Sequence, residues 1–340
     1  MPDSSKPIRI ASIGLNFGAH ASREIKRHPK MELDVVCDLD AAKAQKLADE
    51  LETQPSSSYE EVLADPTIEA VALFTPPHLH AQHITMAAEA GKHIVCTKPL
   101  EISSEKAAQA IDKAEAAGLV VMSNSPPPRY IGNYAIVKDA MDEGRLGKPV
   151  QISGYTWARY DNMEPDGTWY DDPDACPGGP LYRLGIYIIN FANAFLGRPV
   201  EVYAQQSWIR SKRPTPDHAN LVVRYDSGAL MNLAVSLSVG GAVYPDTCLV
   251  AGTDGAVVIN PEFSSGDSDD KKYVVLQGRK KSVHDFRTNL GSYDYDGLHE
   301  FIRQGTRPVI SIRSAVDGVR IIEAARVSLR EKRAVELQQD

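Results

Sequence analysis

A short apolar segment, residues 8–13, runs directly into a turn of small residues. Gly14, Asn16 and Ala19 occupy the three glycine positions of the pattern G-x-G-x-x-G. Small residues there let the backbone approach a pyrophosphate at the N-terminus of a helix, and asparagine tolerates the positive φ that such turns need. The turn therefore predicts a binding site for the diphosphate of a dinucleotide, formed by Gly14, Asn16, Phe17 and Gly18.

An aspartate, Asp38, ends the next apolar run, twenty-four residues after Gly14. In a βαβ unit an acid at this position accepts hydrogen bonds from the ribose hydroxyls and repels a 2′-phosphate. Leu39 follows it and offers no basic side chain for such a phosphate. We therefore expect NAD as the cofactor rather than NADP. A fold of this kind that binds no nucleotide remains the alternative.

Two further segments are expected at the sheet edge where ligands of open α/β proteins bind, outside the carboxyl ends of the strands. The first begins with Thr75 and Pro76 and ends with His80, and we expect these three residues at the cofactor. The second is Thr97–Lys98–Pro99, in which the proline stiffens the loop after an apolar run. Lys98 can donate to a substrate oxygen beside the nicotinamide and stabilise a developing alkoxide. A surface lysine without this role is the alternative.

Metal binding is not expected from the histidines at positions 78, 80 and 83. His80 and His83 would share a helix face, but no nearby carboxylate completes a set of ligands. The four cysteines are scattered without C-x-x-C spacing. This usage favours free thiols in a reducing compartment, and hence a cytoplasmic protein.

The composition describes a chain of 340 residues, 43% hydrophobic and 24% charged, with a net charge of −8. This length suits two domains. Neither nucleic acid nor an anionic membrane is expected as a partner, because no basic stripe is present to bind it. We find no signal peptide pattern and no run of about 18 apolar residues.

Strand and helix patterns alternate up to residue 123, which predicts a doubly wound parallel sheet of the Rossmann type in a domain spanning 1–123. The triplet at 126–128 consists of prolines and marks the boundary. Six strand patterns separated by turns follow between 150 and 276, and helical patterns cover 181–196, 295–304 and 314–331. They predict an α+β domain, 124–340, with a large, mostly antiparallel open sheet.

Residues 230–237 alternate between a small-polar and an apolar face. Helices covering only one side of such a sheet would leave its other face to a partner. A homodimer or homotetramer is therefore expected.

Together these motifs resemble the Gfo/Idh/MocA oxidoreductases, the relatives of glucose-fructose oxidoreductase and inositol dehydrogenase. Members typically show a glycine-rich first turn, an acid after the second strand, a T-P-x-x-x-H segment and an E-K-P loop with the catalytic lysine. The resemblance covers nearly the whole chain and implies a Rossmann domain followed by an α/β domain with a large open sheet. It also implies positions near cofactor or substrate for Asn124 and Arg129, and positions on loops of the substrate domain for Trp169, Asp217 and His218.

Residues 178–190 resemble the family's G-G-G-x-L-x-D-x-G-x-H-x-x-D helix but depart from it at three positions. Arg183 replaces the first aspartate, Tyr187 the histidine and Asn190 the last aspartate. Tyrosine in place of the histidine also resembles the glucose-fructose oxidoreductase branch, which implies that Tyr187 serves as acid or base. Arg183 is four residues away and would share its helix face, at the substrate. It would suit an anionic substituent, or pair instead with Asp171 or Asp172.

The expected function is an NAD-dependent hydride transfer between the nicotinamide and a secondary alcohol or ketone of a sugar, cyclitol or related polyol. Lys98 and Tyr187 would handle the proton, and Arg183, Trp169, Asn190 and His218 would bind the substrate. Two alternatives remain open. One is a glycoside-processing enzyme that uses bound NAD for transient oxidation, and the other is a sensor of the same fold without turnover.

Overall fold

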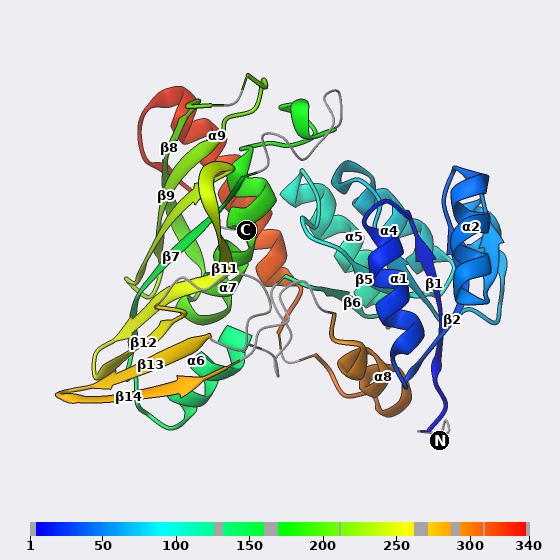
Figure 1. Cartoon of the computed structure of the whole chain (residues 1–340), viewed down its shortest axis with the longest axis horizontal. Coiled ribbons are helices and arrows are strands. Elements are labelled where there is room, and N and C mark those ends of the chain that lie inside the picture. Colours follow the sequence, from blue (N-terminus) through cyan, green and yellow to red (C-terminus); the bar gives the residue numbers. More distant parts are fainter. Residues whose placement is uncertain are drawn as a thin grey trace. The chain divides into compact units, whose positions relative to one another are not determined.

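The computed structural model describes residues 5–125, 132–159, 169–210, 212–261, 271–286, 293–308 and 310–337. The chain divides into two compact units (Figure 1). The first comprises Met1–Asn124 and Tyr293–Ile312, and the second comprises Ser125–Ser292 and Arg313–Asp340. The prolines at 126–128 and Arg129 lie outside the described residues. Within the described ranges, no helix has the length and apolar character needed to cross a bilayer.

Six parallel strands form the sheet of the first unit, in the order β3-β2-β1-β4-β5-β6. The predicted doubly wound sheet is thereby confirmed. A parallel sheet is covered on both faces, which explains why every residue of β4 is apolar and buried. The strands are β1 (Ile8–Ile13), β2 (Met31–Cys37), β3 (Gln54–Ser56), β4 (Ala70–Leu73), β5 (His93–Cys96) and β6 (Val121–Ser123).

Helices cover both faces of this sheet. Side chains of α1, α2 and α8 join one core with alternate residues of the strands, such as Ile10 and Ala72. The intervening residues, such as Val71 and Ile94, are also buried, and α4 and α5 pack on that other face. The helices are α1 (Gly18–Arg27), α2 (Ala41–Leu51), α3 (Tyr59–Ala64), α4 (His80–Glu89), α5 (Ser104–Ala116) and α8 (Tyr295–Gln304).

One of these helices, α8, comes from far along the chain. The chain leaves the first unit after β6, and α8 returns to join the hydrophobic cluster that contains Val95 of β5 and Met122 of β6. The sequence-based division at residue 123 assigned this helix to the second domain, whereas its contacts group it with the first unit. The reason is that Leu298 of α8 is buried in the hydrophobic core of the first unit, and Arg303 of the same helix donates to Glu69 beside β4.

Nine strands form the sheet of the second unit, in the order β14-β13-β12-β11-β7-β10-β9-β8-β15. All neighbours are antiparallel except β7 and β10, so the prediction of a mostly antiparallel sheet is confirmed. The strands are β7 (Pro149–Arg159), β8 (Pro199–Ser207), β9 (His218–Tyr225), β10 (Leu230–Ser236), β11 (Ser238–Gly252), β12 (Gly255–Ile259), β13 (Lys272–Gln277), β14 (Lys280–Asp285) and β15 (Val335–Glu336).

Two of this unit's helices, α7 (Ile186–Leu196) and α9 (Arg313–Glu331), pack against each other and against one face of the sheet, while α6 (Gly132–Asp142) contacts β11 and β12. Met231 and Leu233 are buried on the face that α7 covers. Strand register places Leu230, Val222 and Tyr203 on the opposite face, where each is 39% exposed. The alternation predicted for 230–237 is therefore present.

Candidate functional site

The turn between β1 and α1 requires glycine at two positions. Gly14 has a φ of +85°, and a Cβ there would lie 3.0 Å from the backbone of Phe74. A Cβ on Gly18 would lie 2.9 Å from the Phe74 side chain. No side chain caps the N-terminus of α1, whose N-cap residue is Phe17. The first-turn N–H groups are therefore suited to a ligand anion, and these residues fit a dinucleotide diphosphate.

Asp38 lies at the end of β2, as predicted, and its carboxylate accepts two backbone hydrogen bonds. Leu15 N donates to Oδ2 at 2.7 Å, and Asp40 N donates to Oδ1 at 3.0 Å. These bonds fix the carboxylate beside the glycine turn. Because a carboxylate has about four lone-pair sites, further bonds to ribose hydroxyls remain possible.

Lys43 is a neighbour of this carboxylate that the sequence analysis missed. Its Nζ donates to Asn16 Oδ1 at 2.8 Å and lies 3.6 Å from Asp38 Oδ1. The sequence argument considered only Leu39, the position after Asp38. The signal was a lysine in the first turn of the next helix, which α2 brings back to the end of β2.

The loop of Lys98 follows β5, at the same edge of the parallel sheet as the glycine turn. Lys98 N donates to Asn124 Oδ1 at 3.0 Å, and Asn124 is only 1% exposed. The hydroxyl of Tyr293, which is 6% exposed, donates to Thr97 Oγ1 at 2.9 Å. Buried side chains therefore hold the backbone N–H of Lys98 and the hydroxyl of the preceding Thr97, and one of them comes from the returning segment.

His80 is fully buried and ties two loops of the same edge together. Its Nε2 lies 2.7 Å from the carbonyl oxygen of Thr75, and Nδ1 lies 3.0 and 3.1 Å from those of Pro99 and Leu100. Burial lowers the pKa of His80 to about 4, although the three carbonyl oxygens oppose this shift. The ring lies between carbonyl oxygens of the β4 and β5 loops. Its uncharged form carries one N–H, so at neutral pH it donates to one of these loops and packs against the other.

Thr75 and Pro76 lie between β4 and a 3-10 turn, Pro77–Leu79. The Thr75 hydroxyl lies 3.0 Å from His83 Nδ1. The first unit therefore brings together, at the carboxyl ends of its strands, the residues predicted for the cofactor and Lys98. These are Gly14, Asn16, Phe17, Gly18, Asp38, Thr75, Pro76, His80, Lys98 and Asn124.

In the second unit, Arg183 and Tyr187 are the two partly exposed residues of an otherwise buried stretch, residues 181–190. Arg183 belongs to a π-helical turn, Leu181–Gly185, that continues into α7 at Ile186. Such turns often occur at functional sites. The guanidinium carbon of Arg183 lies 4.1 Å from the ring centre of Tyr170. The predicted pair therefore shares one partly exposed face, with an aromatic ring against the cation.

Asp171 and Asp172, the acids expected as possible partners of Arg183, make other hydrogen bonds. Asp171 Oδ1 accepts from Arg213 at 2.9 Å, and both side chains are largely buried. Asp172 Oδ1 accepts from the backbone N of Asp174 at 2.8 Å. Trp169 packs on Tyr170, with ring centres 3.9 Å apart. Tyr170 thus lies between a predicted substrate residue and the arginine.

Asn190 and His218 lie in different surroundings. Asn190 is 2% exposed and donates to Ser125, while its carbonyl oxygen has no partner among the described residues. Its observed contacts are with protein groups. His218 begins β9 and lies 3.8 Å from Asp217, whose buried carboxylate accepts from the backbone of residues 209 and 210. Asp217 therefore orders the loop before His218.

No group of three or more His, Cys, Asp or Glu side chains among the described residues could hold a metal ion.

Two family models match the chain. Residues 8–125 match an oxidoreductase family with an NAD-binding Rossmann fold, and residues 134–258 match the GFO/IDH/MocA C-terminal domain.

Curated relatives match over nearly the whole chain. A D-xylose 1-dehydrogenase (NADP(+)) of Haloferax volcanii is 28% identical, over 90% of this chain and 92% of the relative. A scyllo-inositol 2-dehydrogenase (NAD(+)) of Bacillus subtilis is 27% identical, over 97% and 96%. The solved structure of an aldose-aldose oxidoreductase from Caulobacter crescentus, complexed with glycerol, has the same fold, with a TM-score of 0.81 at 23% identity over 98% of this chain and 100% of that one. The chain therefore belongs to the Gfo/Idh/MocA oxidoreductase family and is an NAD(P)-dependent dehydrogenase.

Proposed function

We propose that this enzyme transfers a hydride between the nicotinamide of NAD and a secondary alcohol or ketone carbon of a sugar, cyclitol or related polyol. The relatives support this class, because one is a xylose dehydrogenase and another a scyllo-inositol dehydrogenase. Asp38 supports a preference for NAD, since its carboxylate suits the ribose hydroxyls and disfavours a 2′-phosphate.

The observation that carries the proposal is the support of the Lys98 loop. Buried Asn124 accepts from the backbone N–H of Lys98, and buried Tyr293 donates to the Thr97 hydroxyl, at the sheet edge that also carries the uncapped glycine turn. A surface lysine without a role would not need its backbone N–H held by a buried side chain. A lysine that meets a substrate oxygen does, because catalysis by proton transfer depends on hydrogen-bond geometry.

Each of these residues has its own role in binding or in the reaction. Gly14 and Gly18 admit the diphosphate to the start of α1, and Asp38 orients the adenosine ribose. The bound cofactor supplies the site that accepts or donates the hydride. Lys98 donates a hydrogen bond to the carbinol oxygen and stabilises the alkoxide as charge develops. Tyr187 takes up the proton in the oxidative direction and returns it in the reductive one.

A screen of sugars, cyclitols, sugar acids and glycosides tests the proposal, with NAD+ present. The readouts are the absorbance of reduced nicotinamide and chromatography of the products. We expect turnover of at least one secondary alcohol, and its loss in Lys98→Ala. Product formation without net NAD+ reduction would indicate glycoside processing instead. Tight NAD+ binding without turnover of any compound would indicate a sensor.

A further inference from the structure

Lys43 contacts both of the polar side chains that flank the expected adenosine ribose. Its ammonium donates to Asn16 Oδ1 at 2.8 Å and lies 3.6 Å from Asp38 Oδ1. The three side chains come from the first turn of α2, the turn after β1 and the end of β2. Asn16 stands where the dinucleotide pattern usually has a glycine, and here its amide oxygen holds the lysine.

The charge of Asp38 is what excludes a 2′-phosphate from such a site, by repulsion. Lys43 carries the opposite charge at close range, so the pair has no net charge. A neutral ion pair acts on an approaching phosphate as a dipole. The ammonium end of this dipole attracts the phosphate. The carboxylate therefore excludes the phosphate much less than an isolated aspartate would.

The ammonium group of Lys43 also has N–H donors for a ligand. An ammonium group carries three N–H donors, and one of them is used by Asn16. The side chain is 37% exposed, so a ligand can reach it. Asp38, by contrast, is 14% exposed and already accepts from Leu15 N and Asp40 N. A 2′-phosphate would thus meet the lysine more readily than the carboxylate.

We propose that Lys43 is the residue that sets how far this enzyme discriminates between its two nicotinamide cofactors. By neutralising Asp38 and donating to the 2′-phosphate, it makes NADP an accepted second cofactor. This inference rests on the proposed use of NAD at the same turn, and deepens it.

The test measures the affinity of NAD+ and NADP+ by titration calorimetry, without substrate or turnover. Lys43→Gln removes the charge but keeps a side chain able to bond Asn16. Lys46→Gln is the matched control, because Lys46 is exposed on the same helix and the same charge is lost. We expect wild type to bind both cofactors. Lys43→Gln should weaken NADP+ by about tenfold or more and NAD+ by less than about twofold, since charge-assisted hydrogen bonds have this size.

Two further measurements make the outcome specific. Lys43→Arg keeps the charge and should retain NADP+ binding, even where the glutamine variant folds poorly. Added salt should weaken NADP+ more than NAD+ in wild type, and this difference should disappear in Lys43→Gln.

The inference is overturned if wild type binds NAD+ but not NADP+. It is equally overturned if Lys43→Gln weakens both cofactors alike, or if Lys46→Gln has the same effect. Failure of wild type to bind either cofactor would overturn the proposed function together with this inference.

Discussion

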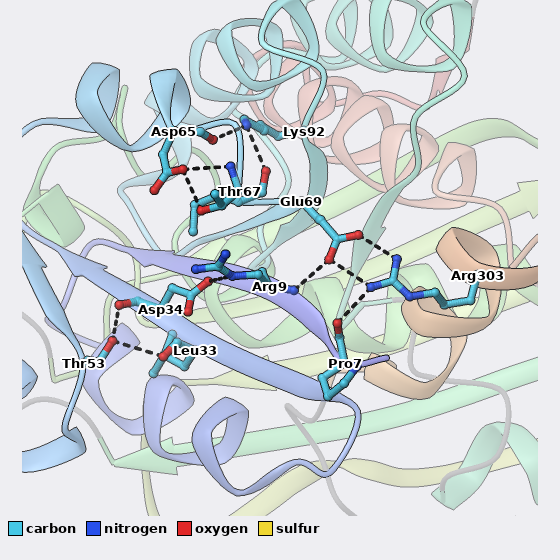
Figure 2. A network of polar contacts seen from close by, with 11 residues as sticks. Pro7, Arg9, Leu33, Asp34, Thr53, Asp65, Thr67, Glu69, Lys92 and Arg303 are labelled. Carbon is cyan, nitrogen blue, oxygen red and sulfur yellow. Dashed lines mark hydrogen bonds and ion pairs between the residues drawn. The ribbon is translucent and has the colours of Figure 1, made fainter. Parts of the chain in front are cut away.

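The guanidinium of Arg303 makes two hydrogen bonds to the carboxylate of Glu69, 2.6 and 2.9 Å long (Figure 2). Arg303 lies on α8, and Glu69 directly precedes β4, 234 residues earlier in the chain. Burial by itself would raise the pKa of Glu69, but the hydrogen bonds from Arg303 and from the backbone of Arg9 outweigh it and lower that pKa. The same guanidinium donates to the carbonyl oxygens of Lys6 and Pro7. These bonds therefore attach α8 to the residues that directly precede β1 and β4.

Replacing Arg303 should destabilise the first unit. Its side chain is only 6% exposed, and Arg303→Met would remove its hydrogen bonds to two carbonyl oxygens and leave Glu69 with the Arg9 N–H but no cationic partner on α8. Breaking a buried pair costs about 3–5 kcal/mol, and the partial exposure of Glu69 reduces this to about 2–3 kcal/mol. Urea unfolding measures the change. Arg307→Met, on an exposed side chain of the same segment, is the control. Equal stability of the two variants would contradict the assignment.

The limits of α8 were predictable from the sequence, but its place was not. The helical pattern at 295–304 coincides with the observed helix, because such a pattern is local. The choice of a surface for α8 depends on contacts with residues hundreds of positions away, such as Glu69. The strand β14 was also missed, because its six residues are all exposed and show no alternation.

Acid should destabilise the protein through His80. Its folded-state pKa, about 4, lies below the ordinary value of 6.5. Between these values the unfolded chain binds more protons than the folded one, so the free energy of unfolding falls as the pH falls. One such group removes about 2 kcal/mol by about pH 5. Burial lowers the pKa of His93 to about 4 as well, which adds in the same direction.

Urea unfolding at about pH 7.5 and about pH 5 measures this loss. His80→Asn should make stability less dependent on pH, and His20→Asn, on the exposed side of α1, controls for the removal of a histidine. The same pH dependence in wild type and His80→Asn would contradict the prediction.

Lys98→Ala should abolish turnover and leave folding and NAD binding nearly intact. A positioned acid–base group contributes about 10²–10⁴-fold in rate. Single-turnover kinetics with the substrate found in the screen would measure it, and calorimetry would check NAD binding. Retention of more than about a tenth of the wild-type kcat would mean that Lys98 is not this group.

The candidate site was predictable where its chemistry follows from strand ends. Gly14, Asp38 and Lys98 lie at the carboxyl edge of one parallel sheet, as their spacing indicated. The side chains that hold the loops at that edge were not predictable. Tyr293 donates a hydrogen bond to Thr97, which lies 196 residues earlier in the chain. The ring of His80 lies against backbone carbonyl oxygens, which every residue provides. Side-chain type carries little information on such contacts before the fold is known.

The open face of the nine-strand sheet should be a homo-oligomer interface. Tyr203, Val222 and Leu230 are exposed there, on the face opposite α7. A charge in this patch, as in Val222→Glu, should shift the protein to monomer in light scattering at micromolar concentration. Ile209→Glu alters an exposed apolar residue outside the strands and is the control. A wild-type protein that is already monomeric would rule the interface out.

Arg183 should give the enzyme a preference for substrates with an anionic substituent. Where relatives of this family typically carry an aspartate, a cation changes the local charge by two units. A hydroxyl gains little from this change, because it hydrogen-bonds to a carboxylate equally well. A carboxylate gains a charge-assisted contact worth about 10–100-fold in affinity. The ring of Tyr170 lies against the guanidinium, with its centre 4.1 Å from Cζ, and helps to position the cation.

The preference is measured as the ratio of kcat/KM for matched sugar acids and neutral sugars. Arg183→Met keeps most of the side-chain volume and removes the charge, so the ratio should fall by about 10–100-fold. Arg198→Met removes an exposed arginine of the same unit and should leave the ratio unchanged. If wild type shows no preference for the acid, or if the preference survives in Arg183→Met, the arginine has a structural role through Tyr170. A fall in the ratio confined to Arg183→Met would identify Arg183 as the group that recognises the anion.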